Sequence, residues 1–375
     1  MIRMLALGVL FACIACSASS PQAGIPAAAA IDDEVRRLIS GEDVAGVALA
    51  VIDDGEIVHL AAYGLRSRER GEPLTRDTIL PAASFTKTAV AYLTLQQVDR
   101  RRLELDHPLS ALADITTSPR YRDLAADPRW RAITPRHVLS HTTGFANFRW
   151  FEDDRRLRLH AGPGSRYGYS GEGFQLLQYV FESALQLDLG AALQGMFDRF
   201  GMTRSRMQWD AALGSNVADG YDEAGKLVPF DRRDAADAAG SLATTIDDQA
   251  RLWAAMVRGD GLSAQSRAAF VTPQIAIRGR AQFPTLDPAT DPRGPAIGLA
   301  AGLGVVVFDD PARGRMWFKG GHDDGTGNFA LCEERARRCV VMLGNSVRAE
   351  RIYPALVRFI LGETAMPWWW EYRQP

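Results

Sequence analysis

The stretch Leu80-Pro-Ala-Ala-Ser84-Phe-Thr-Lys87-Thr-Ala-Val-Ala-Tyr-Leu93 decides how the rest of the chain is interpreted. Apolar residues recur at helical spacing as far as Val98, so Ser84 is predicted at a helix N-terminus. Side chains three residues apart share a helix face, which brings the Ser84 hydroxyl beside the Lys87 amine. A serine needs an adjacent base to act as a nucleophile, and a desolvated lysine loses proton affinity. The spacing predicts a nucleophile and its activator, although a capping serine followed by a solvated lysine would have the same letters.

Length and composition describe an ordinary globular protein. The 375 residues suffice for one large domain or two interleaved ones, with 47% hydrophobic and 23% charged residues. The formal net charge is -2, and positive residues are interspersed with negative ones, as in residues 151–158. This pattern excludes an electrostatic surface for nucleic acid.

The N-terminus has the three parts of a secretory signal. A positive start, Met1-Ile-Arg3, precedes an apolar run at 4–15 and a small polar run at 17–20. The apolar run is too short for a permanent transmembrane helix. Residues 1–30 are therefore predicted to be a signal peptide and linker, and the protein to be exported, either periplasmic or anchored to a membrane.

Cys16 offers a route to that anchor. Its surroundings resemble a bacterial lipoprotein cleavage site, in which the cysteine becomes the lipidated first residue. The position three before it is Cys13 instead of the usual leucine. An ordinary signal peptide cleaved near Ala18 or Ala23 is the alternative, and both remain open.

Cys332 and Cys339 flank the polar segment 333–338, which reads as the turn of a β-hairpin. With the turn centred on Arg335-Ala336, the two cysteines fall opposite one another on adjacent strands, within reach of a disulfide. An exported protein would retain that bond. The alternative is a pair of buried free cysteines.

The β-like segments lie at both ends of the chain and the helical ones in the middle. This order predicts an α+β fold in which one sheet is built from both termini, with a helical part inserted. The predicted domain covers residues 31–365, with an α/β part at about 31–80 and 296–362 and a helical part at about 81–295.

Two histidines, His137 and His141, lie four residues apart on a short predicted helix that Thr134 caps and Gly144 ends. This spacing suits a metal pair, but no acidic residue lies between them as in a zinc protease. Structural histidines are therefore expected, and no metal or other cofactor.

The order of these segments resembles the serine β-lactamase and penicillin-binding protein superfamily, above all class C β-lactamases and the related esterases and D-amino-acid peptidases. The resemblance covers about residues 31–360, and it implies a β-lactamase-like antiparallel sheet flanked by helices. It rests on five segments in the expected order: 77–87, 133–144, 162–170, 240–248 and 319–327.

The resemblance implies catalytic roles for three residues. Ser84 would be the acylated nucleophile and Lys87 its partner. Tyr169, in the glycine-rich loop before a helix, would exchange protons with the serine and the leaving group. Charged neighbours such as Lys87 could hold its phenolate, because a tyrosine pKa near 10 is too high for a base near neutrality.

The family's third motif, Lys/His-x-Gly on a C-terminal strand, would line the site opposite Ser84. One backbone N–H from this strand and that of Ser84 would form the oxyanion hole. Lys319-Gly320-Gly321 matches the residue types of this motif. An alignment on Phe329 instead places His322 at the first position of the motif, followed by Asp323-Asp324 where a glycine is expected. Both assignments remain open, and the residues predicted to line the site here are Lys319, Gly321, His322 and Gly325.

Gly171 replaces the asparagine of the family's Tyr-x-Asn motif, which contacts an acyl-amide substrate. Asp323 and Asp324 also bring negative charge towards the place where the family binds a substrate carboxylate. We therefore expect an exported serine hydrolase that acts on a small-molecule or peptide substrate, with an ester or neutral amide favoured over a β-lactam or D-Ala-D-Ala peptide. The alternatives are a non-catalytic binding or sensing module on this scaffold and metal-dependent hydrolysis through His322 and the two aspartates.

Overall fold

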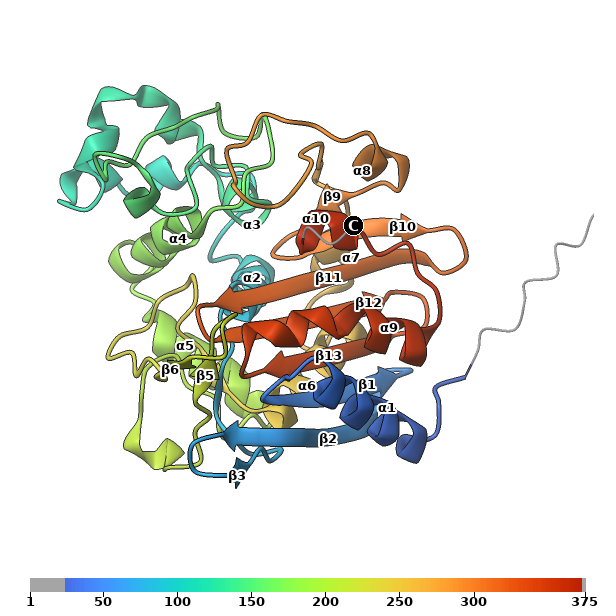
Figure 1. The fold of residues 1–375 in the computed structure, drawn as a ribbon. Coiled ribbons are helices and arrows are strands. Elements are labelled where there is room, and N and C mark those ends of the chain that lie inside the picture. The colour runs from blue at the N-terminus through green and yellow to red at the C-terminus, as the bar shows by residue number, and fades with distance from the viewer. Residues whose placement is uncertain (1–23, 373–375) are drawn as a thin grey trace, which may run out of the picture.

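The structure, a computed structural model, describes residues 24–372 (Figure 1). Most of the predicted signal peptide, together with Cys16, belongs to residues 1–23 and lies outside the described part. None of the helices within residues 24–372 combines the length and the apolar character needed to cross a bilayer.

A nine-stranded antiparallel sheet is built from both ends of the chain, in the order β3-β2-β1-β13-β12-β11-β10-β9-β8. The N-terminal hairpin β1 and β2 joins the C-terminal strands through the pairing of β1 with β13. This arrangement confirms the α+β prediction. The strands are β1 (Gly46–Asp53), β2 (Glu56–Ser67), β3 (Glu72–Pro73), β8 (Ile275–Ala276), β9 (Ala300–Ala301), β10 (Val306–Asp310), β11 (Gly314–Asp323), β12 (Thr326–Glu333) and β13 (Arg338–Gly344).

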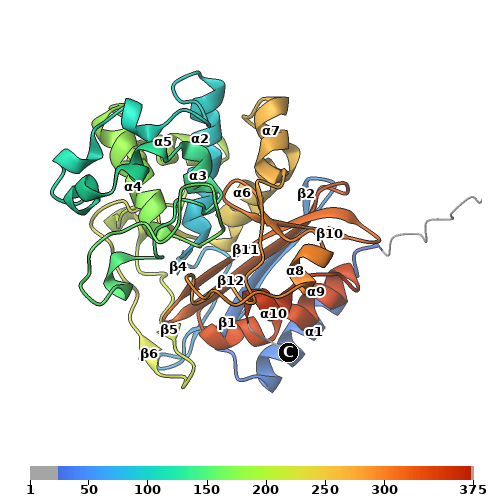
Figure 2. The ribbon, with the colours of Figure 1, turned by 90° about the horizontal axis from the view of Figure 1, so that it is seen from above.

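Helices cover both faces of this sheet, as Figures 1 and 2 show from two directions. One face carries α1 (Ala28–Gly41), α9 (Tyr353–Leu361) and α10 (Trp368–Glu371), and the other carries α2 (Phe85–Asp99), α6 (Ile246–Arg258) and α7 (Ala264–Val271). Side chains of β11 alternate between the two faces, because strand residues point to opposite sides in turn. Met316 and Phe318 join the apolar cluster of the first face, and Trp317 joins that of the second.

The middle of the chain forms short helices and turns beside the second face (Figure 2). The division into parts at residues 80 and 296 stays a prediction. The elements here are β4 (Leu80–Pro81), α3 (Pro135–Leu139), α4 (Gly171–Ser183), α5 (Leu189–Arg199), β5 (Gly220–Tyr221), β6 (Leu227–Val228) and β7 (Ala243–Thr244). Helix α8 (Arg293–Ala296) lies instead near α10, with Arg293 over the ring of Trp369 (Figure 2). Single 3₁₀ turns are η1 (Leu109–Ala111), η2 (Ile115–Thr117), η3 (Arg122–Ala126), η4 (Pro128–Ala132), η5 (Arg149–Phe151), η6 (Ala211–Leu213) and, near the C-terminus, η7 (Val347–Arg351).

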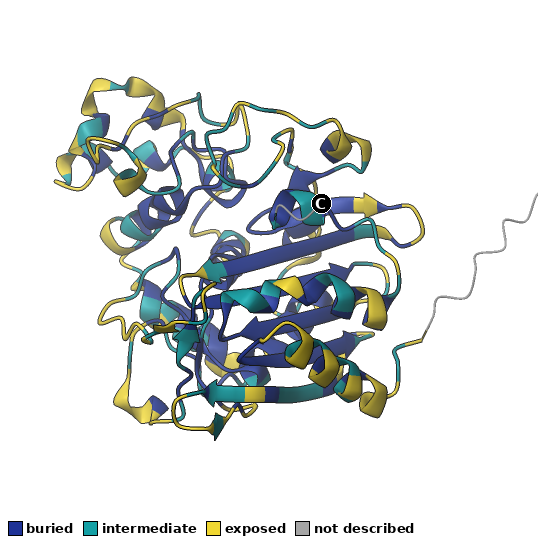
Figure 3. Ribbon diagram, viewed as in Figure 1, coloured by how far each residue is buried: buried dark blue, intermediate teal, exposed yellow. Residues whose placement is uncertain are grey.

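Helix α2 lies at the centre of the molecule. Its residues from Phe85 to Gln97 are all buried, and Figure 3 shows the surrounding core in the same class. A helix that is buried on every side is fixed by packing all around it. The residue at its N-terminus, Ser84, is therefore held by the core of the protein.

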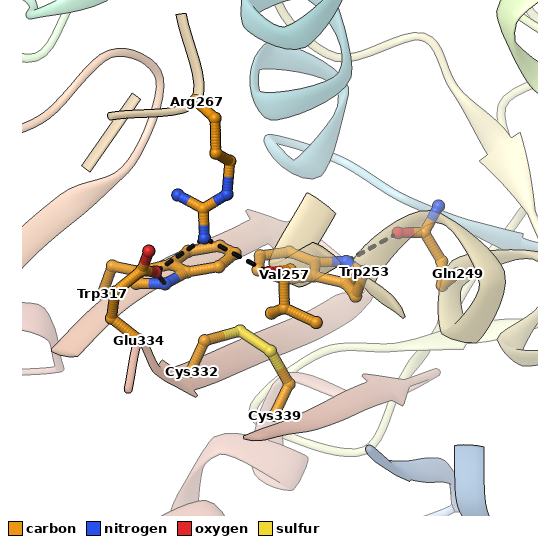
Figure 4. Close-up of a disulfide and its surroundings, with 8 residues drawn as sticks. All are labelled: Gln249, Trp253, Val257, Arg267, Trp317, Cys332, Glu334 and Cys339. Atoms are coloured by element: carbon orange, nitrogen blue, oxygen red, sulfur yellow. Dashed lines mark hydrogen bonds and ion pairs between the residues drawn. A yellow bond between two sulfur atoms is a disulfide. The ribbon is translucent and has the colours of Figure 1, made fainter. Parts of the chain in front are cut away.

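The predicted disulfide joins β12 to β13. Cys332 and Cys339 pair directly in the strand register, with Cα atoms 4.1 Å apart. Figure 4 shows Trp253 of α6 and Trp317 of β11 beside the disulfide, and their rings stack with centroids 5.5 Å apart. Both cysteines are completely buried, so the bond is a structural one.

Candidate active site

Ser84 occupies the N-cap position of α2, but its side chain does not cap the helix. Its Oγ instead lies 3.0 Å from the Lys87 Nζ. The preceding Ala83 has φ of +46°, a left-handed conformation that is unusual for alanine and turns the chain sharply into the helix. The geometry therefore fits the nucleophile interpretation and not that of a simple helix cap.

Lys87 is buried and points back towards Ser84. Its Nζ also donates to the carbonyl oxygen of Ala239 at 2.5 Å. Burial, and next the positive charge of Lys319, hold the pKa of Lys87 well below its usual value, while Asp237 opposes this shift. The uncharged amine is thereby favoured, and an uncharged amine can accept a proton from the serine.

Tyr169 lies between two lysines. The Nζ atoms of Lys87 and Lys319 are each 5.0 Å from its ring centroid, and Lys319 Nζ is 3.3 Å from its hydroxyl oxygen. Burial raises the pKa of Tyr169, although a hydrogen bond with Ser84 opposes the rise. The expected phenolate is therefore not supported: Tyr169 keeps its proton near neutrality and is suited to pass protons on.

Strand alternation on β11 separates the two candidates for the third motif. Lys319 and Gly321 face α2, and a Cβ at Gly321 would lie 2.9 Å from the carbonyl oxygen of Ala82. A glycine is thus needed where β11 approaches the turn before Ser84. The geometry fits Lys319-Gly320-Gly321 as the motif, and burial lowers the pKa of Lys319 to about 8.

His322 faces the opposite side of β11, towards two glutamates. Its Nδ1 contacts Glu350 and its Nε2 lies 3.4 Å from Glu371 of α10. Burial alone would lower the pKa of His322, but the two carboxylates outweigh it and raise this pKa to about 10. The side chain is an imidazolium at the edge of the pocket that holds Ser84.

The backbone of β11 offers an amide to the same pocket. In an antiparallel sheet, the backbone groups of successive residues form hydrogen bonds alternately with the strand on one side and the strand on the other. Glu334 N donates to Arg315 O, so the odd-numbered residues of β11 form their backbone hydrogen bonds with β12. The amide of His322 then points to the other edge, beyond Phe318, where the pairing with β10 ends. With the amide of Ser84, it is a candidate oxyanion donor.

The pocket around Ser84 is lined by two kinds of side chain. The aromatic residues are Phe148, Trp150 and Phe283, and the charged residues besides the lysines and His322 are Arg233, Asp237 and Asp323. Gly325 does not line this pocket, because it lies at the β11–β12 turn and packs against Gly220 and Val228.

The sequence pattern placed the charge of Asp323 at the site but did not predict the other lining residues Phe148, Trp150, Arg233, Asp237 and Phe283. These residues lie in segments without hydrophobic periodicity, and only the run Phe148-Arg-Trp-Phe151 offered a signal.

The two histidines singled out in the sequence have structural contacts. His137 completes a capping box with Thr134 at the start of α3. His141 accepts a hydrogen bond at Nδ1 from Ser170 N at 3.1 Å, and its ring lies 4.2 Å from that of Tyr169, which it helps to position. In the part of the chain from 24 to 372, no three His, Cys, Asp or Glu side chains gather as a metal-binding group.

This chain belongs to the beta-lactamase family, whose sequence model matches residues 31–362. It is 30% identical to esterase EstB from Burkholderia gladioli over 195 residues, which is 45% of this chain and 48% of the esterase. It is 29% identical to a D-aminopeptidase from Brucella anthropi over 194 residues, which is 49% of this chain and 37% of that protein. The chain thus spans about half the length of the esterase and less of the aminopeptidase.

Solved structures confirm the fold. The octameric penicillin-binding protein homologue from Pyrococcus abyssi superposes with a TM-score of 0.72 at 20% identity, covering 90% of this chain and 78% of that one. A D-alanine carboxypeptidase from Burkholderia cenocepacia gives 0.70 at 21% identity, covering 90% and 99%. The family points to a serine hydrolase.

Proposed function

We propose that the protein is an exported serine hydrolase that cleaves an ester or neutral amide through an acyl-Ser84 intermediate. One observation carries the proposal: the Ser84 Oγ, which caps nothing, lies 3.0 Å from the amine of a buried lysine. The depressed pKa of Lys87 gives this pair the protonation state that a nucleophile needs.

The site suits two successive acyl transfers. Neutral Lys87 takes the proton of Ser84 as Oγ bonds to the substrate carbonyl carbon, and the amides of Ser84 and His322 stabilise the oxyanion. Tyr169 passes a proton to the leaving oxygen or nitrogen as the bond between it and the carbonyl carbon breaks. Water then attacks the acyl-enzyme, and its proton returns through the same groups to restore Ser84.

The substrate preference rests on what surrounds these groups. Gly171 presents no amide side chain, and Asp323 places negative charge at the pocket. Asp323 opposes a substrate carboxylate at its end of the pocket, although Arg233 and His322 line the same pocket. An ester or neutral amide fits better, and the similarity to an esterase supports this choice.

Labelling with a fluorophosphonate probe tests the proposal. The parent protein should be labelled and Ser84→Ala should not, with both folded by circular dichroism. A panel of nitrocefin, a p-nitrophenyl ester and a D-Ala-D-Ala peptide should show turnover of the ester above the other two. A parent that resists every acylating probe would favour the non-catalytic alternative.

A further inference from the structure

Three aromatic side chains form a shelf along one side of the pocket. Phe148 and Trp150 line the pocket with Ser84, and the ring of Phe151 lies beside both of them. The rings of Phe148 and Trp150 stack with centroids 4.1 Å apart and planes 9° apart, and the Phe151 centroid is 6.3 Å from that of Trp150. We call these residues, Phe148, Trp150 and Phe151, the aromatic shelf.

The residue between the stacked rings fixes the shelf. Arg149 points the other way and binds the buried Glu172 of α4, through Nε to Oε1 at 2.8 Å and Nη2 to Oε2 at 2.8 Å. The Arg149 backbone amide donates to the same carboxylate at 3.0 Å. Three bonds to one buried carboxylate hold the loop in place, so the shelf is formed before any substrate binds.

Gly171 makes room for the shelf. A Cβ at this position would lie 2.3 Å from Cε1 and 2.4 Å from Cζ of Phe148, well inside contact distance. The ring of Phe148 therefore fills the space that a side chain at position 171 would need. This matching of Gly171 to Phe148 favours a pocket adapted to a different substrate over a site that has lost its function.

The shelf lies close to the reacting groups, on one defined side. The Phe148 centroid is 6.0 Å from Lys87 Nζ, which is itself 3.0 Å from Ser84 Oγ. Of the groups that would protonate a leaving atom, Lys319 lies on β11, and its Nζ is 3.3 Å from the hydroxyl oxygen of Tyr169. A substrate that places its leaving group at β11 extends its acyl group towards α4 and the shelf.

The shelf also contains two strongly exposed aromatic side chains. Trp150 is 53% exposed and Phe151 is 68% exposed, the two largest values among the exposed large hydrophobic side chains of residues 24–372. Stacked aromatic surface of this kind next to a pocket indicates a place where an apolar ligand is buried.

We infer that the aromatic shelf binds a flat apolar acyl group, so the substrate class is esters of aryl or arylalkyl carboxylic acids. This inference rests on the proposed acyl-Ser84 mechanism. The shelf selects the acid part of the ester, and the alcohol part lies on the β11 side of the pocket.

Two esters with the same leaving group test the inference: p-nitrophenyl phenylacetate and p-nitrophenyl acetate. The ratio of their kcat/KM values, aryl over acetyl, should exceed one in the parent and fall about tenfold in Trp150→Ala, because a stacked aromatic contact is lost. Phe148→Leu, which keeps an apolar side chain without a flat face, should lower the ratio as well. Phe359→Ala, which removes an exposed aromatic of α9 outside the pocket, is the control and should keep the parent ratio.

The outcomes separate this inference from the proposed function. Equal ratios in the parent, Trp150→Ala and Phe148→Leu, with fluorophosphonate labelling of Ser84 intact in all three, would overturn the shelf and leave the hydrolase standing. A parent that is not labelled would overturn both. Loss of the ratio in the control as well would also overturn the shelf, since the effect would not belong to these residues.

Discussion

Replacing Gly171 by alanine adds one methyl group to the space that the Phe148 ring occupies. The ring atom that would lie 2.3 Å from the new Cβ must move by about 1 Å to reach ordinary contact distance. That movement disturbs the stack of Phe148 on Trp150, now at 4.1 Å between centroids. Aromatic pairs of this kind contribute about 0.5–1.5 kcal/mol.

The effect of Gly171→Ala on the free energy of unfolding should therefore depend on the ring. Without Phe148, alanine in place of glycine should stabilise the protein by about 0.5 kcal/mol, because it restricts the unfolded chain. With Phe148 present, the displaced ring should cancel or reverse that gain. A double-mutant cycle of Gly171→Ala and Phe148→Ala, measured by urea unfolding, should give a coupling of about 1 kcal/mol.

Activity provides the second readout. Gly171→Ala should lose the preference for the phenylacetyl ester about as strongly as Trp150→Ala, because both disturb the same shelf. Gly195→Ala is the matched control: this glycine lies within α5 and an added Cβ would approach only Arg199, at 3.9 Å. Equal unfolding effects of Gly171→Ala in both backgrounds, with an unchanged ester preference, would refute the reasoning.

The remaining predictions concern charge and cross-linking. kcat/KM should fall on the alkaline side near pH 8 as Lys319 loses its proton, and Glu371→Gln should move this limb to lower pH, because the Glu371 carboxylate raises the pKa of Lys319. A limb that stays in place would contradict that assignment. The raised pKa of His322, about 10, implies stability that is complete below its ordinary pKa of 6.5 and lost as pH rises to 10. Urea unfolding should thus show that Glu371→Gln lowers the free energy of unfolding more at pH 6 than at pH 10. Equal decreases at the two pH values would argue against this role of His322. Removing both Cys332 and Cys339 by alanine should cost about 2.5 kcal/mol of unfolding free energy at constant kcat/KM, as expected for a short closed loop; unfolding at the parent urea concentration would show that the bond contributes nothing.

Features set by neighbours in the sequence were predictable. Ser84 and Lys87 are one helical turn apart, so the spacing alone implied their contact, which the structure places at 3.0 Å. The pairing of Cys332 with Cys339 followed from a turn of four residues between two strands. In both cases the local geometry of one element or one hairpin determines the distance.

The choice between Lys319 and His322 required the register of β11. A shift of one residue in a strand moves every side chain to the other face, and the letters of the motif fitted two alignments. The structure directs Lys319 to Tyr169 and His322 to the opposite face, where Glu350 and Glu371 come from the end of the chain. Such contacts join segments far apart in sequence and leave no local pattern.

The aromatic shelf could not be predicted for a similar reason. Phe148 and Trp150 lie at the start of and within the short 3₁₀ turn η5, and their orientation depends on the three bonds between Arg149 and Glu172, which lies on a different element. Gly171 showed only as a departure from a motif. Its structural role follows only from the position of the Phe148 ring, which fills the space beside it.

The central claim is that Ser84 carries the acyl group during turnover. Acid quenching of the protein during reaction with p-nitrophenyl phenylacetate, followed by trypsin and mass spectrometry, tests it directly. The account predicts a phenylacetyl group on the peptide Asp77–Lys87, at Ser84, and none in Ser84→Ala. Turnover of the ester with this peptide unmodified, or with the acyl group on another residue, would contradict it.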